Sequence, residues 1–293
     1  MKKVFSPSVL LALSMACFGT IGYFVRHISL PTGEIALYRA LLAIILIGVF
    51  MLITKRKIVF RAIKKELVWL FLSGVFMGIN WVLLFEAYKY TTVSAATLCY
   101  YFAPVLVTIA CPFLFKEKMG AKQWVCFVMS TVGLVLITGI GDMSSGSTHI
   151  KGMLFGLSAA VFYASVVLIN KRLGSVDGIT RTFLQFVSSV AVLLPYVLLT
   201  GGINVLSLDT AGTVNLLLVG FVHTGITYCL YFSSLKYLSG QTASVLSYID
   251  PLVAVLVSVT LLGENITAVQ IIGGVLILGF TLLNEIKIAA IQY

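Results

Sequence analysis

The sequence predicts an all-α integral membrane protein with ten transmembrane helices, and three observations lead to that prediction. Of the 293 residues, 60% are hydrophobic and only 10% are charged, whereas about 25% of the residues in soluble domains are charged. Ten apolar runs each reach the length of about 17–25 residues that a helix needs to cross a bilayer. Lys and Arg fall mostly between these runs. This composition excludes a soluble enzyme, and the dispersed cations argue against a nucleic-acid-binding face.

The ten expected spans follow one another along the chain and are separated by short loops. The first half contributes five runs, at Val4–Val25, Ile35–Thr54, Leu67–Phe85, Val93–Phe115 and Gln123–Gly141. The second half contributes five more, at Gly152–Asn170, Thr182–Thr200, Ala211–Leu235, Thr242–Leu262 and Thr267–Asn284. Backbone N–H and C=O groups must be paired inside the hydrocarbon, so apolar runs of this length are expected as helices.

The first run is expected to remain part of the protein. Lys2 and Lys3 precede it, as in a secretory signal peptide, and Ala16 and Cys17 follow within it. The apolar run nevertheless continues to Val25, which is longer than the hydrophobic region of a typical signal peptide. We therefore expect it to be retained as the first span.

The distribution of Lys and Arg predicts the orientation, because cytoplasmic loops retain positive charge. With the N-terminus inside, Arg26, Lys89 and Lys151 fall outside and Arg39 lies within the second span. The other 16 of the 20 cations fall in cytoplasmic segments: Lys2, Lys3, Lys55, Arg56, Lys57, Arg61, Lys64, Lys65, Lys116, Lys118, Lys122, Lys171, Arg172, Arg181, Lys236 and Lys287. We expect an inner-membrane protein with both termini in the cytoplasm.

The two halves of the chain resemble each other, and we expect two repeats, residues 1–145 and 146–293. An offset of 147 positions aligns Lys89-Tyr90 with Lys236-Tyr237, Ala96 with Ala243, Tyr101 with Tyr248, Pro104 with Pro251 and Glu117 with Glu264. Five spans per repeat is an odd number, so the second repeat enters the membrane from the opposite side. Inverted repeats of this kind are a construction of secondary transporters.

The aligned motifs resemble those of the drug/metabolite transporter superfamily, and within it the ten-helix EamA-like transporters. The resemblance rests on Ala96 to Pro104, Ala243 to Pro251, Gly263-Glu264-Asn265-Ile266-Thr267, Gln270 and Gly273-Gly274. In the first repeat, Phe115-Lys116-Glu117-Lys118 departs from the pattern. The resemblance implies two five-helix repeats around a central cavity between the first, third, fourth, sixth, eighth and ninth helices. It also implies transport of amino acids, amines, carboxylates, nucleotide precursors or drugs.

Two prolines mark corresponding positions in the fourth and ninth spans. Pro104 and Pro251 each interrupt a helix near its middle, and paired interruptions of this kind are typical of transporter binding sites. The alternative is a packing kink that neighbouring helices tolerate.

Asp250 is the single carboxylate near the middle of an expected span. A charge there costs about 2.5–3.5 kcal/mol on insertion scales. Its counterpart in the first repeat is Ala103, so only one repeat carries the charge. Two roles are open: a proton carrier or counter-ion for an amine, and a protonated carboxyl group bonded to a neighbouring helix. The association of intramembrane charges with function favours the first role.

Three further polar residues lie within the spans. His223, in the eighth span, is a candidate for proton exchange, with a neutral histidine bonded between helices as the alternative. Arg39 and Glu86 lie toward the external ends of the second and third spans. They are candidates for an external gate, or for a fixed structural pair.

Aromatic residues at comparable depth are candidates for contact with the solute. Rings near one carboxylate suit an organic cation, since each cation–π contact is worth about 0.5–2 kcal/mol. The alternative is ordinary packing against core or lipid. The candidates are Phe18, Trp81, Tyr100, Tyr101, Phe162, Tyr163, Tyr228, Tyr231 and Tyr248.

No motif for a metal ion or a cofactor accompanies the spans. The five cysteines form no Cys-x-x-Cys pair and are expected as packing residues. No phosphate-binding Gly-rich loop ends in Lys-Ser or Lys-Thr, so ATP hydrolysis is excluded as the driving force. We expect the partners to be a small-molecule solute, the lipid bilayer and, as a further hypothesis, protons.

The sequence thus predicts a secondary active transporter, with efflux of amino acids or related metabolites by alternating access as the leading hypothesis. A carrier of organic cations or amines is the alternative. A membrane enzyme is less well supported: Gly139–Asp142 spells a Gly-x-Gly-Asp motif of intramembrane aspartyl proteases, but at the end of a span. The inverted repeat argues against a channel or lipid scramblase. The oligomeric state is left open.

Overall fold

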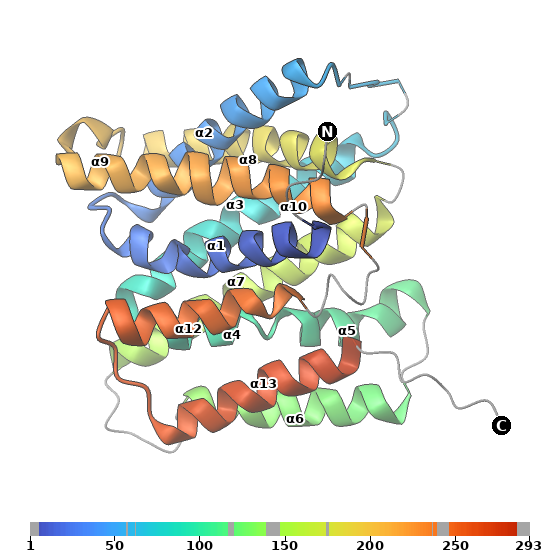
Figure 1. Ribbon diagram of the computed structural model, residues 1–293, viewed down its shortest axis with the longest axis vertical. Helices are drawn as coiled ribbons and strands as arrows, with labels where there is room; N and C mark the ends of the chain where they lie inside the picture. The colour runs from blue at the N-terminus through green and yellow to red at the C-terminus, as the bar shows by residue number, and fades with distance from the viewer. Residues whose placement is uncertain are drawn as a thin grey trace.

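The computed structural model describes residues 6–56, 58–61, 63–116, 120–138, 147–173, 176–235, 237–238 and 246–285, and none of these residues forms a strand. Helices run side by side across the body in Figure 1. Several residues named above lie outside the described ranges: Lys2, Lys3, Lys57, Glu117, Lys118, the Gly139–Asp142 motif, Lys236, Ala243 and Lys287. The expected boundary between the repeats, at residues 145 and 146, also lies outside them.

The first half of the chain supplies the first five spans, of which the fourth is divided in two. Hydroxyl side chains cap two of these helices: Ser6 accepts from the amide of Val9, and Thr92 accepts from that of Ala95. Such caps pair amide groups that the helix itself leaves free. The helices are α1 (Pro7–Arg26), α2 (Thr32–Ile53), α3 (Leu67–Tyr90), α4 (Val93–Tyr100), α5 (Ala103–Phe115) and α6 (Ala121–Thr138).

The second half supplies the other five spans, and its third span changes helix type along its length. There α9 (Thr210–Leu217) continues into the π-helix η2 (Leu218–Ile226) and then into α10 (Thr227–Leu235). The remaining elements are α7 (Ser147–Arg172), α8 (Gly178–Thr200), the short 3-10 helix η1 (Val205–Ser207), α12 (Ile249–Leu261) and α13 (Ala268–Glu285).

The predicted all-α membrane fold is confirmed. Seven described helical segments are long and apolar enough to cross a membrane. Three shorter apolar helices, Ala121–Ile137, Ile249–Leu261 and Ala268–Leu283, occupy the three remaining expected spans.

Contacts between the two halves occur in matching pairs. α1 packs against α12, and its counterpart α7 packs against α4 and α5. Likewise α3 packs against α7, and its counterparts η2 and α10 pack against α1. The corresponding helices α2 and α8, α4 and α12, and α6 and α13 pack against each other. The α6–α13 pair forms one edge of the body in Figure 1. This arrangement fits two repeats related by a pseudo-two-fold axis.

The first helices of the two halves run in opposite directions. Arg26, which ends α1, donates to the carbonyl of Thr91, and the hydroxyl of Thr91 bonds His149 near the start of α7. We call this end of the molecule the Arg26 end. The opposite end, where Arg56 pairs with Asp177 at 3.3 Å, is the Arg56 end.

Two contacts between the halves are so close that a side chain would not fit. A Cβ atom at Gly74 on α3 would lie 2.4 Å from the carbonyl oxygen of Gln185 on α8. A Cβ atom at Gly133 on α6 would lie 2.6 Å from the carbonyl oxygen of Gly273 on α13. Small residues at such positions let membrane helices approach closely.

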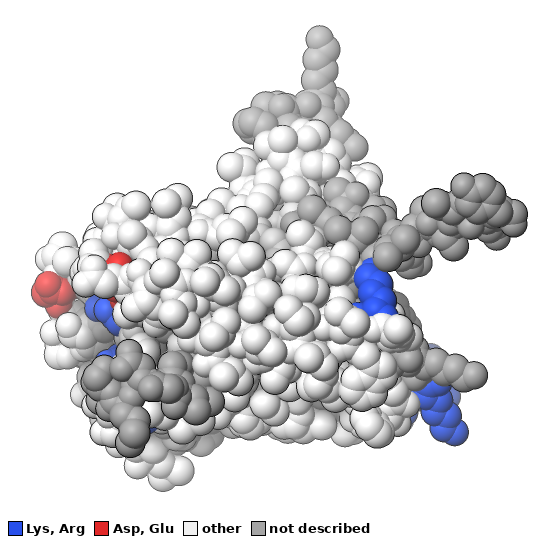
Figure 2. Space-filling view, turned by 90° about the horizontal axis from the view of Figure 1, so that it is seen from below, with Lys and Arg blue, Asp and Glu red and all other residues white. Residues whose placement is uncertain are grey.

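The outer surface has the character expected of a membrane protein. In Figure 2 the visible charged side chains lie at the two ends of the body, with a broad uncharged region between them. Large apolar side chains are exposed on the helices that border this region, among them Trp124, Val128 and Val132 on α6 and Leu256 and Ile272 on α12 and α13. Exposed apolar patches of this extent suit contact with lipid.

Candidate functional site

The fourth and ninth spans are interrupted at corresponding residues. α4 ends at Tyr100 and α5 begins at Ala103, with Pro104 in its first turn. In the second half a turn at Tyr248 precedes α12, and Pro251 lies in the first turn of that helix. Proline has no N–H to donate to the carbonyl four residues earlier, so both helices restart at the proline. Tyr101 and Tyr248, which the offset of 147 positions aligns, thus both lie at breaks.

Asp250 lies in the first turn of α12, directly beside this break. The hydroxyl of Tyr101 donates a 2.5 Å hydrogen bond to its Oδ2 atom. On the other side, Gly19 of α1 packs against the backbone of Asp250, because a Cβ atom there would lie 2.5 Å from the carbonyl oxygen. The half-buried carboxylate therefore joins the second half of the chain to the first.

Aromatic side chains from both halves surround this contact. The ring of Tyr100 lies 6.0 Å from that of Tyr101 and 5.2 Å from that of Tyr163 on α7. A second set of rings links α1, α3, α8 and α10: Phe18–Tyr228 at 5.1 Å, Phe18–Tyr231 at 6.4 Å, Trp81–Phe186 at 5.2 Å and Phe186–Tyr228 at 5.3 Å. We call Phe18, Trp81, Tyr100, Tyr101, Tyr163, Phe186, Tyr228 and Tyr231 the central aromatic group.

Arg39 borders the central aromatic group from α2. Its side chain is buried, and its guanidinium carbon lies 4.4 Å from the centre of the Trp81 ring. Its Nε atom donates a 2.8 Å hydrogen bond to the hydroxyl of Thr224 on η2. A charge within a span costs about 2.5–3.5 kcal/mol, of which the cation–π contact offsets about 0.5–2 kcal/mol. No carboxylate among the described residues lies within ion-pair distance of Arg39.

The π-helix η2 positions two of the polar groups at this level. The side chains of His223 and Thr224 both bond carbonyl oxygens five residues earlier, those of Leu218 and Val219, at 3.1 and 2.7 Å. This spacing matches the five-residue hydrogen-bonding interval of a π-helix, a form often found at functional sites. η2 thereby presents Thr224 to Arg39 and His223 to α1.

His223 is buried and has a partner for each ring nitrogen. Nδ1 faces the carbonyl of Leu218 and must carry a hydrogen, while Nε2 lies 2.9 Å from the hydroxyl of Thr20. Thr20 can also donate to the carbonyl of Cys17, at 2.8 Å. Its single hydrogen goes to His223 when the ring is neutral and to Cys17 when the ring is protonated. The ring can therefore take or release a proton with both nitrogens paired.

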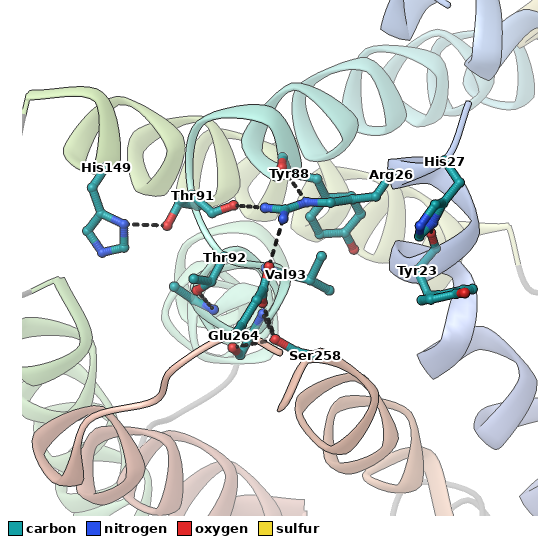
Figure 3. Close-up of polar contacts among 12 residues, drawn as sticks. Tyr23, Arg26, His27, Tyr88, Thr91, Thr92, Val93, His149, Ser258 and Glu264 are labelled. Atoms are coloured by element: carbon teal, nitrogen blue, oxygen red, sulfur yellow. Dashed lines mark hydrogen bonds and ion pairs between the residues drawn. The ribbon is translucent and has the colours of Figure 1, made fainter. Parts of the chain in front are cut away.

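A separate polar network lies at the Arg26 end (Figure 3). Arg26 forms a 3.0 Å ion pair with Glu264 in the α12–α13 loop, and it donates to the backbone carbonyls of Tyr88 and Thr91 at 2.9 and 2.5 Å. Glu264 also accepts from the amide of Val93, at 2.8 Å, and from the hydroxyl of Ser258. We call these six residues the Arg26–Glu264 network. It ties α1, the start of α4 and the α12–α13 loop together.

The structure does not bring the two expected gate residues together. Glu86 accepts from the hydroxyl of Thr32 at 2.8 Å and pairs with Lys89 at 3.4 Å. Arg39 instead contacts Trp81 and Thr224, deeper in the helix bundle. The expected Arg39–Glu86 pair is therefore not formed, because each residue has other partners. The gating role of either residue stays a prediction.

The other predicted residues divide between the site and its surroundings. Phe18, Trp81, Tyr100, Tyr101, Tyr163, Tyr228 and Tyr231 belong to the central aromatic group, whereas Phe162 packs against Phe76 on α3 at 5.6 Å. The sequence did not mark Thr20, Phe186, Thr224 or Arg26 as site residues. These residues acquire their contacts only through the packing of distant helices, and no local motif marks them.

The comparisons with known proteins agree with this architecture. The EamA-like transporter family matches residues 6–139 and again residues 150–285. A relative from Bacillus subtilis (strain 168), named as the uncharacterized transporter YxxF, is 30% identical over 277 residues, covering 94% of this chain and 88% of the relative. A relative from Archaeoglobus fulgidus, also named as an uncharacterized transporter, is 28% identical and covers 93% of this chain and 94% of its own length.

A solved crystal structure shares the fold. It superimposes with a TM-score of 0.65 at 16% sequence identity, over 94% of this chain and 97% of that one. Together with the two family matches and the apolar helices, these likenesses lead to a multi-pass membrane protein. The chain belongs to the EamA-like transporter family.

Proposed function

We propose that the protein is a secondary active transporter that exports amino acids or related metabolites by alternating access, with a proton carried by Asp250 in the opposite direction. The observation that carries this proposal is the 2.5 Å hydrogen bond from Tyr101 to Asp250. It joins the two halves of the chain at the helix breaks, and aromatic rings from both halves lie beside it.

The contact offers a physical route from proton binding to movement of the halves. An ionised Asp250 accepts a charge-assisted hydrogen bond from Tyr101, which is roughly twice as strong as a neutral one. A proton on Asp250 weakens this bond and removes a charge from the interior of the span. Protonation therefore shifts the balance between arrangements of the two halves, as a ligand does when it prefers one state.

The direction and the orientation belong to the same proposal. Support for an inner-membrane location with cytoplasmic termini comes from the 16 Lys and Arg residues on one side against three on the other. A proton gradient directed into the cell can then drive a solute outward by exchange.

The test uses purified full-length protein in vesicles with the charge-neutral variant Asp250→Asn. The wild-type protein is expected to exchange labelled against unlabelled amino acid in saturable counterflow, and to accumulate it when a pH gradient is imposed. Asp250→Asn should retain counterflow, which moves no net proton, and should lose at least about 90% of the gradient-driven accumulation, since no proton can bind at that position. Arg172→Gln is a matched control, because Arg172 stacks on Trp69 at 4.6 Å and is exposed.

Each outcome decides a different part of the proposal. Absence of counterflow with every amino acid tested contradicts amino-acid transport. Equal gradient-driven accumulation by wild type and Asp250→Asn contradicts the proton role of this carboxylate.

A second candidate function is transport of organic cations. It is favoured by the position of the Asp250 carboxylate beside the rings of Tyr100, Tyr101 and Tyr163, since rings next to a carboxylate attract cations. Counterflow of quaternary amines, abolished in Asp250→Asn, would favour this function over amino-acid export.

A further inference from the structure

Arg39 is a buried cation to which the proposed proton-coupled mechanism assigns no role. Its side chain is 5% exposed, and no described carboxylate lies within ion-pair distance of it. Buried charges in proteins are normally paired, because an isolated charge is costly to bury. Arg39 therefore retains the capacity to bind an anion.

We propose that Arg39 binds the carboxylate of the transported solute, an inference that rests on the proposed function. Guanidinium groups match carboxylates through pairs of parallel hydrogen bonds. Among the described residues, the only hydrogen bond from this guanidinium is that of Nε to Thr224, at 2.8 Å. The four N–H groups on its two Nη atoms thus meet no described acceptor, and they can form the bidentate pair.

The neighbours of Arg39 hold the guanidinium in place for such a pair. Trp81 covers one face, with 4.4 Å between its ring centre and the guanidinium carbon, and Phe85 lies beside it at 5.6 Å. Thr224 accepts the hydrogen bond from Nε, and its hydroxyl in turn donates to the carbonyl of Val219. A cation fixed in this way loses little rotational freedom when an anion binds.

Arg39 and Asp250 both lie near the same three tyrosine side chains. The hydroxyl groups of Tyr88, Tyr100 and Tyr228 lie within electrostatic range of both charges. The two charges do not pair with each other. The centre of the molecule thus offers a cation and an anion separately, as a solute that carries both a carboxylate and an ammonium group requires.

A purely structural role is the competing interpretation. In that case Arg39 holds α2 against η2, and its loss disturbs the binding of every solute alike. The two roles therefore differ in whether the effect of a substitution depends on the charge of the probe.

The experiment measures dissociation constants of three probes for the full-length protein in detergent, by thermal stabilisation and by equilibrium binding. L-Phenylalanine carries both charged groups, 3-phenylpropionate carries only the carboxylate, and phenethylamine carries only the ammonium group. All three share the ring that suits the central aromatic group. The variants are Arg39→Gln, which keeps a hydrogen-bond donor, Arg39→Lys, which keeps the charge, and the control Arg172→Gln.

Arg39→Gln is expected to raise the dissociation constants of L-phenylalanine and 3-phenylpropionate by roughly 10- to 100-fold, the range for losing charged hydrogen bonds. The dissociation constant of phenethylamine should stay within about twofold of the wild-type value. Arg39→Lys should restore part of the loss, and Arg172→Gln should change none of the three. An equal loss for all three probes in Arg39→Gln overturns the inference. So does the failure of both carboxylate probes to bind the wild-type protein.

Failure of this inference can be told apart from failure of the proposed function. If wild-type vesicles show amino-acid counterflow but the preference for carboxylates survives Arg39→Gln, the inference is wrong and the transport function stands. If wild-type vesicles show no counterflow, the proposed function fails and the inference fails with it.

Discussion

The Arg26–Glu264 network and the central aromatic group both join the two halves of the chain, but they treat charge in opposite ways. In the network, Arg26 and Glu264 pair at 3.0 Å and their remaining hydrogen bonds go mainly to backbone groups. At the centre, the contacts described for Arg39 and Asp250 are with neutral side chains, namely Thr224, Trp81, Phe85 and Tyr101. The two charges of the network neutralise each other, whereas the two central charges have no partner of opposite charge among the described residues, and our proposal assigns them to the solute and the proton.

The largest expected effect is the loss of the network in Glu264→Ala. The substitution leaves Arg26 without its ion-pair partner and the amide of Val93 without the carboxylate that accepts from it. Breaking a buried ion pair costs about 3–5 kcal/mol, and the partial exposure of Arg26, at 31% of its side chain, places this case near the lower limit. Thermal unfolding in detergent measures the loss.

Glu264→Ala also distinguishes the roles of the two regions. Probe binding by the Glu264→Ala protein that remains folded should stay close to wild type, because no described hydrogen bond or ion pair joins the network to the central aromatic group. A variant with unchanged unfolding temperature and impaired binding would reverse the roles assigned to the two regions.

A smaller effect is expected from Tyr101→Phe at the centre. The substitution keeps the ring and removes the hydroxyl that donates to Asp250. Losing a hydrogen bond to a charged group corresponds to about 1.5–3 kcal/mol, and the half-buried carboxylate should regain part of this from water. We expect gradient-driven transport to fall by roughly 3- to 10-fold, with an unfolding temperature close to that of wild type. If Tyr101→Phe lowered the unfolding temperature but left transport per folded molecule unchanged, the Tyr101–Asp250 contact would serve stability and not transport.

The smallest effect is expected at the Arg56 end. Arg56 pairs with Asp177 at 3.3 Å, and both side chains are well exposed, at 39% and 54%. Exposed ion pairs contribute about 0–1 kcal/mol. Asp177 in addition caps α8, accepting from the amide of Ile179, and this contact does not depend on Arg56. Arg56→Gln should therefore leave both the unfolding temperature and transport within experimental error of wild type. A decrease of more than about 1 kcal/mol in the free energy of unfolding would show that the Arg56–Asp177 pair stabilises the protein as the Arg26–Glu264 network does.

The sequence allowed the fold to be predicted because membrane spans leave a strong local signal. Apolar runs of bilayer length marked all ten spans, and the spacing of Pro104 and Pro251 marked the two helix breaks that the structure contains. Asp250 was also singled out as a candidate from its own position, because a carboxylate inside a span is rare; its role stays a prediction.

The partners of these residues could not be predicted, because they depend on packing between segments far apart in the chain. Arg39 was expected beside Glu86, but α2 packs against η2 and presents Arg39 to Thr224. Glu264 was noted only in the alignment of the repeats and in a family motif, and its ion pair with Arg26 spans most of the chain. A π-helix also leaves no mark in apolar periodicity, so the exact directions of the side chains on the eighth span were beyond sequence analysis.

The π-helix has a consequence for engineering the protein. The number of residues in the π segment of the eighth span can be changed by itself, because a π-helix holds about one residue more per turn than an α-helix. Deleting one residue from Leu218–Ile226 would remove such an extra residue, so that a π turn becomes an α turn and the flanking helices α9 and α10 keep their faces. The side chains of η2 next to the deletion would then turn by about 100° relative to both helices, the angle between neighbouring residues of an α-helix. A single deletion would thus separate Thr224 from Arg39, or His223 from Thr20, without changing any of these four residues.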